Sequence, residues 1–352
     1  MKKILFLLLC FPLFLFSQNW NQVGQDIYGD AIWDNFGSSV SMSDDGNIMA
    51  IGATFADGNQ NNDGSVSVYQ NVNNTWIQLG QDIYGEDIED NSGRSVSISG
   101  DGSIIAIGAV GNNGNGNNSG HVRVYNYNGS SWTQLGQDID GESSDDLSGY
   151  SVSLSSDGNT LAIGATENDG NGNSSGHARI FNYNGSSWTQ LGQDIDGEVA
   201  NDQSGISVSM SGDGNIIAIG AKYNDGNGFG SGHVRIYQNV SGSWSQLGQD
   251  IDGAAVNDEG GNSVSLSNDG NTVAIGAKDN DGGGSNSGHV RIYMWNGSSW
   301  TQLGQDIDGE AANDNSGWSV SMSSDGNKVA IGAVNNDGNG NPSGHVRIFQ
   351  NI

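Results

Sequence analysis

The sequence repeats itself with a period of 56 residues. A tryptophan opens each copy, and a Ser-Val-Ser triplet follows it at a fixed distance. The tryptophans are Trp20, Trp76, Trp132, Trp188, Trp244 and Trp300. A regular period of this length predicts a repeat architecture, in which each unit buries its apolar face against the next one. We interpret the periodic tryptophans as packing between neighbouring units.

Each copy contains four short segments in which apolar and polar residues alternate, separated by clusters of Gly, Asn and Asp. Alternation with a period of two residues is typical of β-strands, and four such strands per copy are typical of a propeller blade. The copy that begins at Trp132 predicts strands at 132–139, 150–155, 161–165 and 176–182. The six copies therefore predict an all-β chain that forms a six-bladed β-propeller with four-stranded blades.

Two dipeptides mark the predicted hairpin turns. Asp157-Gly158 separates the second strand from the third, and Asn184-Gly185 separates the fourth strand from the first strand of the next copy. Both dipeptides favour two-residue type I′ turns, because their residues tolerate positive φ. Counting outward from a two-residue turn pairs Phe181 with Trp188 across the hairpin.

The tryptophan segment at the start of the sequence, residues 20–27, is not preceded by a fourth strand with which it would form a hairpin. The sequence ends at Ile352, within what would be the next such hairpin. We therefore expect the N-terminal strand to close the last blade, with Trp20 against Phe349. Closure of this kind removes a sheet edge that otherwise promotes aggregation.

The first 18 residues have the pattern of a signal peptide. Lys2-Lys3 precedes an apolar run over residues 4–16, and Ser17-Gln18 is the expected cleavage region. This run is too short to span a bilayer, and no later stretch is apolar enough, so we expect no membrane span. A single propeller domain, residues 19–352, is then expected to be secreted or to lie at the cell surface.

The chain is strongly acidic. Its formal net charge of −29 becomes −31 when Lys2 and Lys3 are removed. Nucleic acids and anionic membranes bind clustered Lys and Arg, so neither is expected as a partner. Cys10 is the only cysteine and lies in the leader, so the exported domain must be stable without disulfides. We expect a monomer without an organic cofactor.

The first copy reads Phe36-Gly37, then Ala50-Ile51-Gly52-Ala53, then Gly64 to Tyr69 with alternating Ser and Val. These motifs resemble FG-GAP repeats, which form the blades of the integrin α-subunit propeller and of many exported bacterial proteins. The resemblance extends over all six copies, residues 19–352. It implies an extracellular adhesion or ligand-recognition module.

The sequence departs from the family pattern in several respects. Only the first copy keeps Phe-Gly, and the proline of Gly-Ala-Pro is replaced in every copy. The family often has an Asp-x-Asp-x-Asp-Gly calcium loop between its second and third strand elements, where this chain has a tight Asp-Gly turn. The family's usual seven blades are not matched either. The calcium site of the family is therefore not carried over.

The best metal candidate is the loop that follows each Ile-Gly-Ala strand. Its alternating Asp and Asn side chains around a glycine offer hard oxygen ligands to Ca²⁺. A second acidic loop precedes each Ser-Val-Ser strand, and we expect both loops on one face, where their carboxylates can meet one ion. The candidate ligands are Asp169, Asn171, Asp225, Asp281, Asp337 and Asn339. The alternative is that these residues only form turns and cap backbone groups.

A histidine precedes an arginine by two residues in five copies, at His121, His177, His233, His289 and His345. Alternation along a strand places both side chains on the same side. A functional interpretation is that the five imidazoles are catalytic or bind metals. However, five equivalent positions around a ring do not form one active site. We favour a structural role, with His and Arg hydrogen-bonded to an Asp or a carbonyl of the neighbouring strand.

One position differs in every copy, the residue before Ser-Val-Ser. It begins the strand expected to be innermost, so these residues are expected to ring one mouth of the central channel. Positions that vary among near-identical copies are candidates for contacts with a specific ligand. The candidates are Arg94, Tyr150, Asn262 and Trp318. The alternative is that an exposed strand start accepts any residue.

These features favour a secreted, non-enzymatic propeller that binds an extracellular protein or glycan, with Ca²⁺ as a candidate requirement. The alternative is an extracellular polysaccharide hydrolase or lyase that uses the channel mouth. No nucleophile with its base and no paired carboxylates stand out from the repetition, so the binding module is the first prediction.

Overall fold

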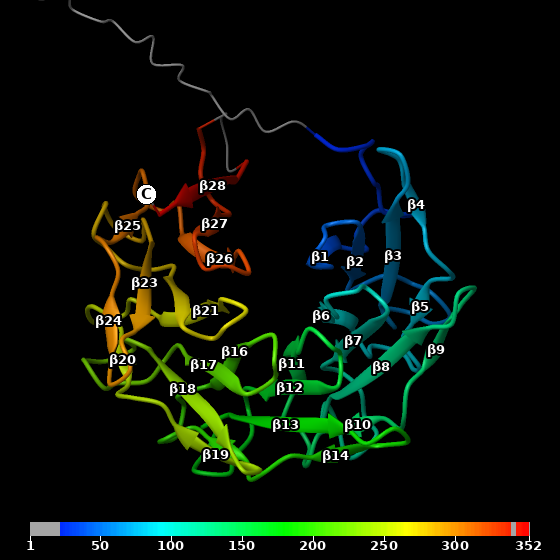
Figure 1. Cartoon of the computed structure of the whole chain (residues 1–352), viewed down its shortest axis with the longest axis horizontal. Helices are drawn as coiled ribbons and strands as arrows, with labels where there is room; N and C mark the ends of the chain where they lie inside the picture. The colour runs from blue at the N-terminus through cyan, green and yellow to red at the C-terminus, as the bar shows by residue number, and fades with distance from the viewer. Residues whose placement is uncertain (1–21, 339–342, 352) are drawn as a thin grey trace, which may run out of the picture.

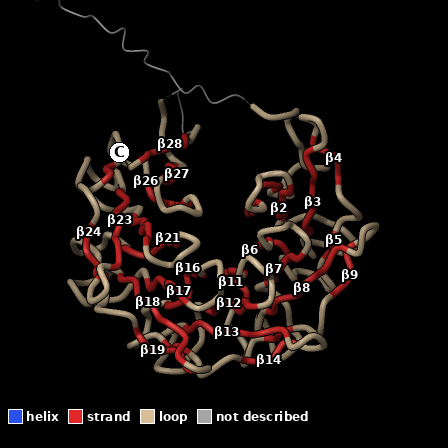
Figure 2. The backbone as a smooth tube through the Cα atoms, in the orientation of Figure 1, coloured by secondary structure: helices blue, strands red, loops and turns tan. Residues whose placement is uncertain are grey.

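The computed structural model describes residues 22–338 and 343–351, and within them every regular element is a β-strand (Figure 1). The strands form six sheets placed side by side around a central axis (Figure 2). The all-β class, the six blades and the repeat of about 56 residues are confirmed. In the part of the chain that is described, no helix is long and apolar enough to cross a membrane.

The two inner strands of each blade run antiparallel to each other. The innermost strands are β1 (Phe36–Met42), β6 (Ser92–Ile98), β11 (Ser148–Leu154), β16 (Ser204–Met210), β21 (Gly260–Leu266) and β26 (Ser316–Met322). The second strands are β2 (Ile48–Ala53), β7 (Ile104–Ala109), β12 (Thr160–Ala165), β17 (Ile216–Ala221), β22 (Thr272–Ala277) and β27 (Lys328–Ala333).

The third strand of each blade carries the histidine and arginine positions. The third strands are β3 (Ser65–Asn71), β8 (His121–Tyr127), β13 (His177–Tyr183), β18 (His233–Val240), β23 (His289–Trp295) and β28 (His345–Gln350). The outer strands are β4 (Trp76–Gln78) with β5 (Ile83–Tyr84), β9 (Trp132–Gln134) with β10 (Ile139–Asp140), β14 (Trp188–Gln190) with β15 (Ile195–Asp196), β19 (Ser243–Gln246) with β20 (Ile251–Asp252), and β24 (Trp300–Gln302) with β25 (Ile307–Asp308).

The outer strand is interrupted in each of these five blades. Residues 132–139 were expected to form one strand, but β9 and β10 are two short pieces that both pair with β8. Gly136 lies between them with a φ of +81°, a left-handed conformation that ends regular pairing. The blades are therefore four-stranded antiparallel sheets whose outer strand is divided in two.

Apolar side chains pack between neighbouring blades and form the core. Ala106, Val122 and Val124 of the second blade pack with Val152 and Leu154 of the third. The indole of Trp132 is buried in the preceding junction and donates to the carbonyl of Leu79 at 2.7 Å. The prediction that the periodic tryptophans pack between blades is confirmed for Trp132, Trp188, Trp244 and Trp300. Trp76 is only partly buried, and Trp20 lies outside the described residues.

Each inner strand begins with a bulge at a glycine that all six copies retain. In β6 the pairing shifts between Ser92 and Ser95, and Gly93 has a φ of +85°. A Cβ at Gly93 would lie 2.6 Å from the carbonyl oxygen of Ser65 in the preceding blade. Only glycine permits this approach, which lets adjacent blades pack at their inner edges.

The hairpin between the third and outer strands has a different register from the predicted one. Tyr183 pairs with Trp188, and their ring centroids are 5.3 Å apart, whereas a two-residue turn required Phe181 at this place. The side-chain oxygen of Asn184 accepts the backbone N–H groups of Ser186 and Ser187, both at 3.0 Å. These bonds stabilise a four-residue turn, so the predicted pairing was wrong by two residues.

The Asp-Gly turn is not of type I′. Gly158 has a φ of +70°, but Asp157 is not in the left-handed region, as type I′ requires. The Ser155 N–H donates to the carbonyl of Thr160, and the Gly158 N–H donates to that of Ser155, both at 2.9 Å. The Asp157 carboxylate accepts the Asn159 N–H at 3.0 Å and thereby supports the longer turn.

The last blade differs from the others in its outer strand. Among the described residues β28 pairs only with β27, and residues 22–27 form no strand, so the predicted closing strand is not observed there. Trp20, expected against Phe349, lies outside the described residues. The described start of the chain contacts the first blade instead, where Trp76 donates to the carbonyl of Val23 at 2.9 Å.

The first and last blades stand apart in Figure 1. Their facing sides are consequently exposed. Val346 of β28 is 65% exposed, whereas its counterpart Val122 in the second blade is fully buried. Val40 and Met42 of β1 are also exposed, although their counterparts are buried between blades. The described chain is therefore an open arc of six blades.

Candidate functional site

The two acidic loops of each copy lie on the same face of the propeller, as predicted. One precedes each innermost strand, and the other follows each second strand. Asp145 donates its backbone N–H to the carbonyl of Asn117 at 2.7 Å, and Leu147 donates to that of Asn118 at 3.2 Å. The loop after β7 therefore contacts the loop before β11. We call the surface formed by these loops the loop face.

The aspartates predicted to bind Ca²⁺ support their own loops. The Asp169 carboxylate accepts the backbone N–H of Ser174 at 2.8 Å. Asp225 and Asp281 accept the equivalent bonds in their loops, at 2.7 and 2.8 Å. Each of these aspartates thus has the turn-stabilising role that was the alternative to metal binding.

The remaining predicted ligands are dispersed in the same way. The Asn171 side chain donates to the carbonyl of Gly197 at 3.0 Å, Asp337 is exposed in its loop, and Asn339 lies outside the described residues. The candidates are spread over four loops in different blades, and none of the aspartates joins a cluster of three or more His, Cys, Asp or Glu residues in the described chain. Calcium binding at the loop face stays a prediction.

A different carboxylate organises the loop before each innermost strand. Asp90 is fully buried and accepts the backbone N–H groups of Glu86 and Asp87, both at 2.9 Å. Its counterparts Asp146, Asp202, Asp258 and Asp314 are buried as well. Buried carboxylates need such donors, so these acidic residues are explained by loop structure.

Each arginine of the third strands connects neighbouring segments. Arg123 donates to the carbonyl of Tyr84 at 2.6 Å, and another of its nitrogens lies 3.2 Å from the Glu86 carboxylate. Its guanidinium carbon is 5.6 Å from the centre of the Tyr125 ring. The third and fourth copies show the same contacts with a glutamate, a carbonyl and a ring. The structural interpretation of the arginines is confirmed.

In the described chain the histidines form none of the side-chain hydrogen bonds predicted for them. His121, His177 and His233 are buried, and each has a ring nitrogen with no hydrogen-bond partner in the described chain. Burial, reinforced by the adjacent arginine, lowers the pKa of each to about 4. The three imidazoles are therefore neutral at neutral pH.

Each of these three histidines lies near a glutamate and an aspartate, with possible ligand atoms within 4.8 Å of one another. One imidazole and two carboxylates are the donors of many transition-metal sites. However, Arg179 lies 3.6 Å from Glu142 in the group that contains His177, so this carboxylate is already paired with a cation. Because the arrangement repeats and includes an arginine, it is explained by packing between blades.

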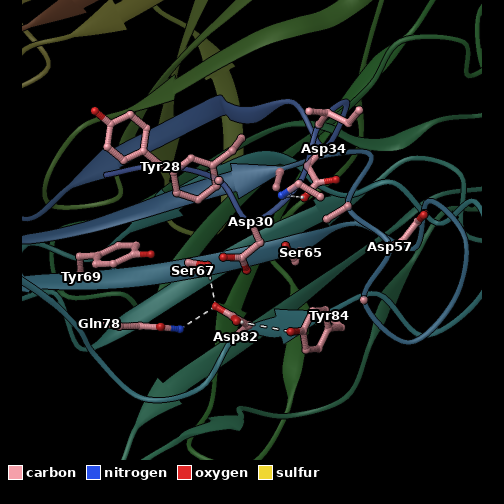
Figure 3. A pocket seen from close by; sticks show the side chains of 17 residues that line it. Tyr28, Asp30, Asp34, Asp57, Ser65, Ser67, Tyr69, Gln78, Asp82 and Tyr84 are labelled. Atoms are coloured by element: carbon pink, nitrogen blue, oxygen red, sulfur yellow. Dashed lines mark hydrogen bonds between the residues drawn. The ribbon is translucent and has the colours of Figure 1, made fainter. Parts of the chain in front are cut away.

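The first blade differs from the others at both of these positions. Ser65 and Ser67 on β3 occupy the places of the histidine and the arginine. The two small side chains leave a cavity of about 210 Å³ (Figure 3). Asp30 and Asp82 are among the residues that line it. We call this cavity the first-blade pocket.

Asp82 is held at the centre of the polar contacts in the first-blade pocket. Its carboxylate accepts the Ser67 hydroxyl at 2.6 Å, the Gln78 amide at 2.7 Å and, at 3.4 Å, the Tyr84 hydroxyl (Figure 3). Burial, followed by the charges of Asp82 and Asp30, raises the pKa of Tyr69, so this phenol stays neutral. The pocket therefore combines carboxylates with neutral aromatic rings.

The residues predicted at the channel mouth contact one another in pairs. The Arg94 guanidinium stacks over the Tyr150 ring, with 4.2 Å to its centroid. The Asn262 amide donates to the backbone carbonyl of Trp318 at 3.1 Å. Two pairs between neighbouring blades are observed instead of one cluster of acid and base groups. This arrangement adds no support to a hydrolase or lyase at the mouth.

The fourth copy carries an aromatic site on the loop face that sequence reasoning missed. Phe229 is 74% exposed and lines a cavity of about 310 Å³ together with Tyr223, Asp225, Asn257 and Glu259. The equivalent residues of the other copies are Asn61, Asn117, Asn173, Ser285 and Asn341. The departure of Phe229 from this polar set was the available signal. We call this cavity the aromatic pocket.

Solved structures with similar folds include hydrazine synthase of Kuenenia stuttgartiensis, at 15% identity and a TM-score of 0.57, covering 89% of this chain and 83% of that one. A putative 6-phosphogluconolactonase of Bacteroides fragilis has 13% identity and a TM-score of 0.59, covering 90% and 80%. A periplasmic gluconolactonase of Pseudomonas aeruginosa has 15% identity and a TM-score of 0.57, covering 90% and 81%. Likeness at such low identity shows the fold alone.

No curated protein matches the chain in sequence. The family described as FG-GAP repeat matches it four times, at residues 31–69, 87–125, 195–237 and 307–349. Each match extends from the loop before an innermost strand, or the outer strand preceding it, to the third strand of the same blade. The chain is therefore an FG-GAP repeat protein that folds as a six-bladed β-propeller.

Proposed function

We propose that this propeller is an exported, non-enzymatic recognition module that binds a protein or glycan partner through its loop face. The observation that carries this proposal is the aromatic pocket of the fourth copy. Export is supported by the signal-peptide pattern at the start of the sequence. Ca²⁺ at the acidic loops is a further part of the proposal, supported by their oxygen-rich composition.

The aromatic pocket has the composition of a recognition site. Phe229 and Tyr223 provide ring surface, while Asp225, Asn257 and Glu259 provide hydrogen-bonding groups at the same cavity. An exposed aromatic ring gains free energy when a partner covers it, and rings beside polar groups bind both sugar faces and apolar side chains. A site of this kind on only one of six similar copies favours one specific partner.

The loop around Phe229 is held in place by its neighbour. The Asn257 N–H donates to the Phe229 carbonyl at 2.8 Å, and the Asp225 carboxylate accepts the Gly230 N–H at 2.7 Å. These bonds hold the backbone of the loop in place, with the Phe229 ring exposed, before a partner arrives. A preformed site loses less conformational entropy on binding.

The test is a binding screen of the exported domain, residues 19–352, against a glycan array and a panel of extracellular matrix proteins. We expect a partner in one of the two panels, and its identity separates glycan from protein recognition. Phe229→Ala should weaken binding at least tenfold, which corresponds to about 1.4 kcal/mol. The matched control, Ser285→Ala, changes the equivalent position of the fifth copy and should leave binding unchanged.

Two results would count against the proposal. One is a folded wild-type protein that binds nothing in either panel. The other is an equal loss of affinity for Phe229→Ala and Ser285→Ala, which would place the binding surface elsewhere. A parallel screen with EDTA and with millimolar Ca²⁺ tests the calcium requirement separately, because metal removal should weaken binding only if the ion supports the loop face.

A further inference from the structure

The buried arginines show what a guanidinium needs at this position of the fold. Around Arg123 the surroundings are the carbonyl of Tyr84, the carboxylate of Glu86 and the ring of Tyr125. The arginines of the third and fourth copies are equally buried and have the same three kinds of contact. The fold therefore repeats a guanidinium-binding environment from blade to blade.

The first blade keeps this environment but lacks the guanidinium. Tyr28 occupies the position of the residue whose carbonyl accepts from the arginine, Asp30 that of the carboxylate and Tyr69 that of the ring. All three line the first-blade pocket. Ser67 stands in place of the arginine, and Ser65 in place of the histidine. The cavity of about 210 Å³ is the space that the two larger side chains fill in the other copies.

The carboxylates of Asp30 and Asp82 in the first-blade pocket are not paired with a cation in the described chain. The sequence contains no Lys or Arg between residues 4 and 93. Ser65 is only 8% exposed, and its hydroxyl forms no hydrogen bond in the described chain. This hydroxyl lines the pocket and is available to a ligand that enters it.

We propose that the first-blade pocket binds a guanidinium group supplied from outside the chain, most favourably the arginine side chain of a partner protein. Asp30 and Asp82 provide the negative charge, and the Tyr69 ring provides the aromatic face. This site lies in the first blade and is separate from the aromatic pocket of the fourth copy. Its existence does not depend on the function proposed above.

Three properties of the pocket favour guanidinium over other cations. A planar guanidinium stacks on an aromatic ring and donates several hydrogen bonds at once, whereas an ammonium is more strongly hydrated. Ca²⁺ needs six to eight oxygen ligands, and tyrosine rings occupy part of the lining. Asp34 and Asp57 also line the pocket, so the α-carboxylate of free arginine is repelled.

The experiment is calorimetric titration of the exported domain with N-acetyl-arginine amide, with free arginine and with N-acetyl-lysine amide. We expect one site per chain, an affinity for the arginine amide at least tenfold above that for the lysine amide, and weaker binding of free arginine. Binding should weaken as salt is added, because the attraction is ionic. Asp30→Asn should lower the affinity at least tenfold.

Two variants control for the fold. Ser67→Arg places an internal guanidinium in the pocket, as in five other copies, and should abolish binding while the protein stays folded. Glu142→Gln changes the carboxylate at the position of Asp30 in the third copy, where Arg179 is present, and should leave the titration unchanged. The proposal is overturned if the folded wild type binds no arginine amide, if Ser67→Arg binds it as well as wild type, or if the lysine amide or Ca²⁺ binds equally tightly.

Discussion

The three buried histidines predict a loss of stability in mild acid. His121, His177 and His233 have a pKa of about 4 in the folded protein, against an ordinary value of 6.5. As the pH falls below 6.5, protons bind the unfolded chain first and favour it. The stabilisation is complete above pH 6.5 and is lost as the pH approaches 4, where the folded histidines also protonate.

The magnitude follows from the size of the shift. Between pH 7 and pH 5.5, linkage gives slightly more than about 1 kcal/mol for each histidine with these two pKa values, and about 4 kcal/mol for the three together. These side chains are almost fully buried, so solvent screening reduces the effect little. The window ends at pH 5.5 because burial raises the pKa of Glu86 and Glu142, and their protonation in the folded state offsets part of the loss at lower pH.

The measurement is urea unfolding followed by tryptophan fluorescence at pH 7 and at pH 5.5. The free energy of unfolding should fall by about 4 kcal/mol over this interval. His177→Asn removes one of the three titrating groups and should reduce the difference by about a third, whatever it does to stability at pH 7. Thr189→Ser, at an exposed position of β14, should leave the difference unchanged.

The reasoning fails if the free energy of unfolding is the same at both pH values. It also fails if an NMR titration of the folded protein shows these imidazoles protonating near pH 6.5. Either result would mean that a carboxylate or water reaches the ring nitrogens that have no partner in the described chain. The group of Glu142, His177 and Asp194 would then hold a charged imidazole.

Further predictions concern the core, the open ends of the arc and the acidic loops. Ile163→Ala, at a buried position of β12, should cost about 2–5 kcal/mol in urea unfolding, whereas Ile88→Ala at a half-exposed loop position should stay within about 0.5 kcal/mol. Val234→Asp should prevent stable folding because this position is buried, whereas the exposed Val346→Asp should leave the melting temperature nearly unchanged. A large fall in the melting temperature of Val346→Asp would show that the two end blades pack together in solution. Millimolar Ca²⁺ added after EDTA should raise the melting temperature, and Asp225→Asn should reduce the rise; no rise for the wild type would leave the loops with a turn role only.

The blades were predictable because their determinants are local. Strands such as β11 and β12 are recognisable from alternation and from the turn residues between them, and the period of 56 residues supplied their number and order. The errors arose where a side chain changed the turn. Asn184 binds the backbone N–H groups of the following serines, which lengthens the hairpin and moves the partner of Trp188 from Phe181 to Tyr183.

The candidate sites were less predictable, because they depend on residues that are distant in the sequence. The acidic loops were expected to gather around Ca²⁺, but Asp169 and Asp225 bind their own backbones in separate blades. The exposure of Phe229 follows from how its loop rests on the neighbouring one, through the Asn257 N–H. Composition alone does not distinguish a turn residue from a ligand.

The sequence by itself determined the repeat, the all-β class and the six blades, because strand alternation and turn chemistry act over a few residues. Only the tertiary structure decided what the exceptions to the repeat mean. Ser65 and Ser67 are visible as departures in the sequence, yet the pocket exists because blade packing brings Asp30, Tyr69 and Asp82 around them. Contacts between distant segments are set by the packing of whole blades, which no local pattern specifies.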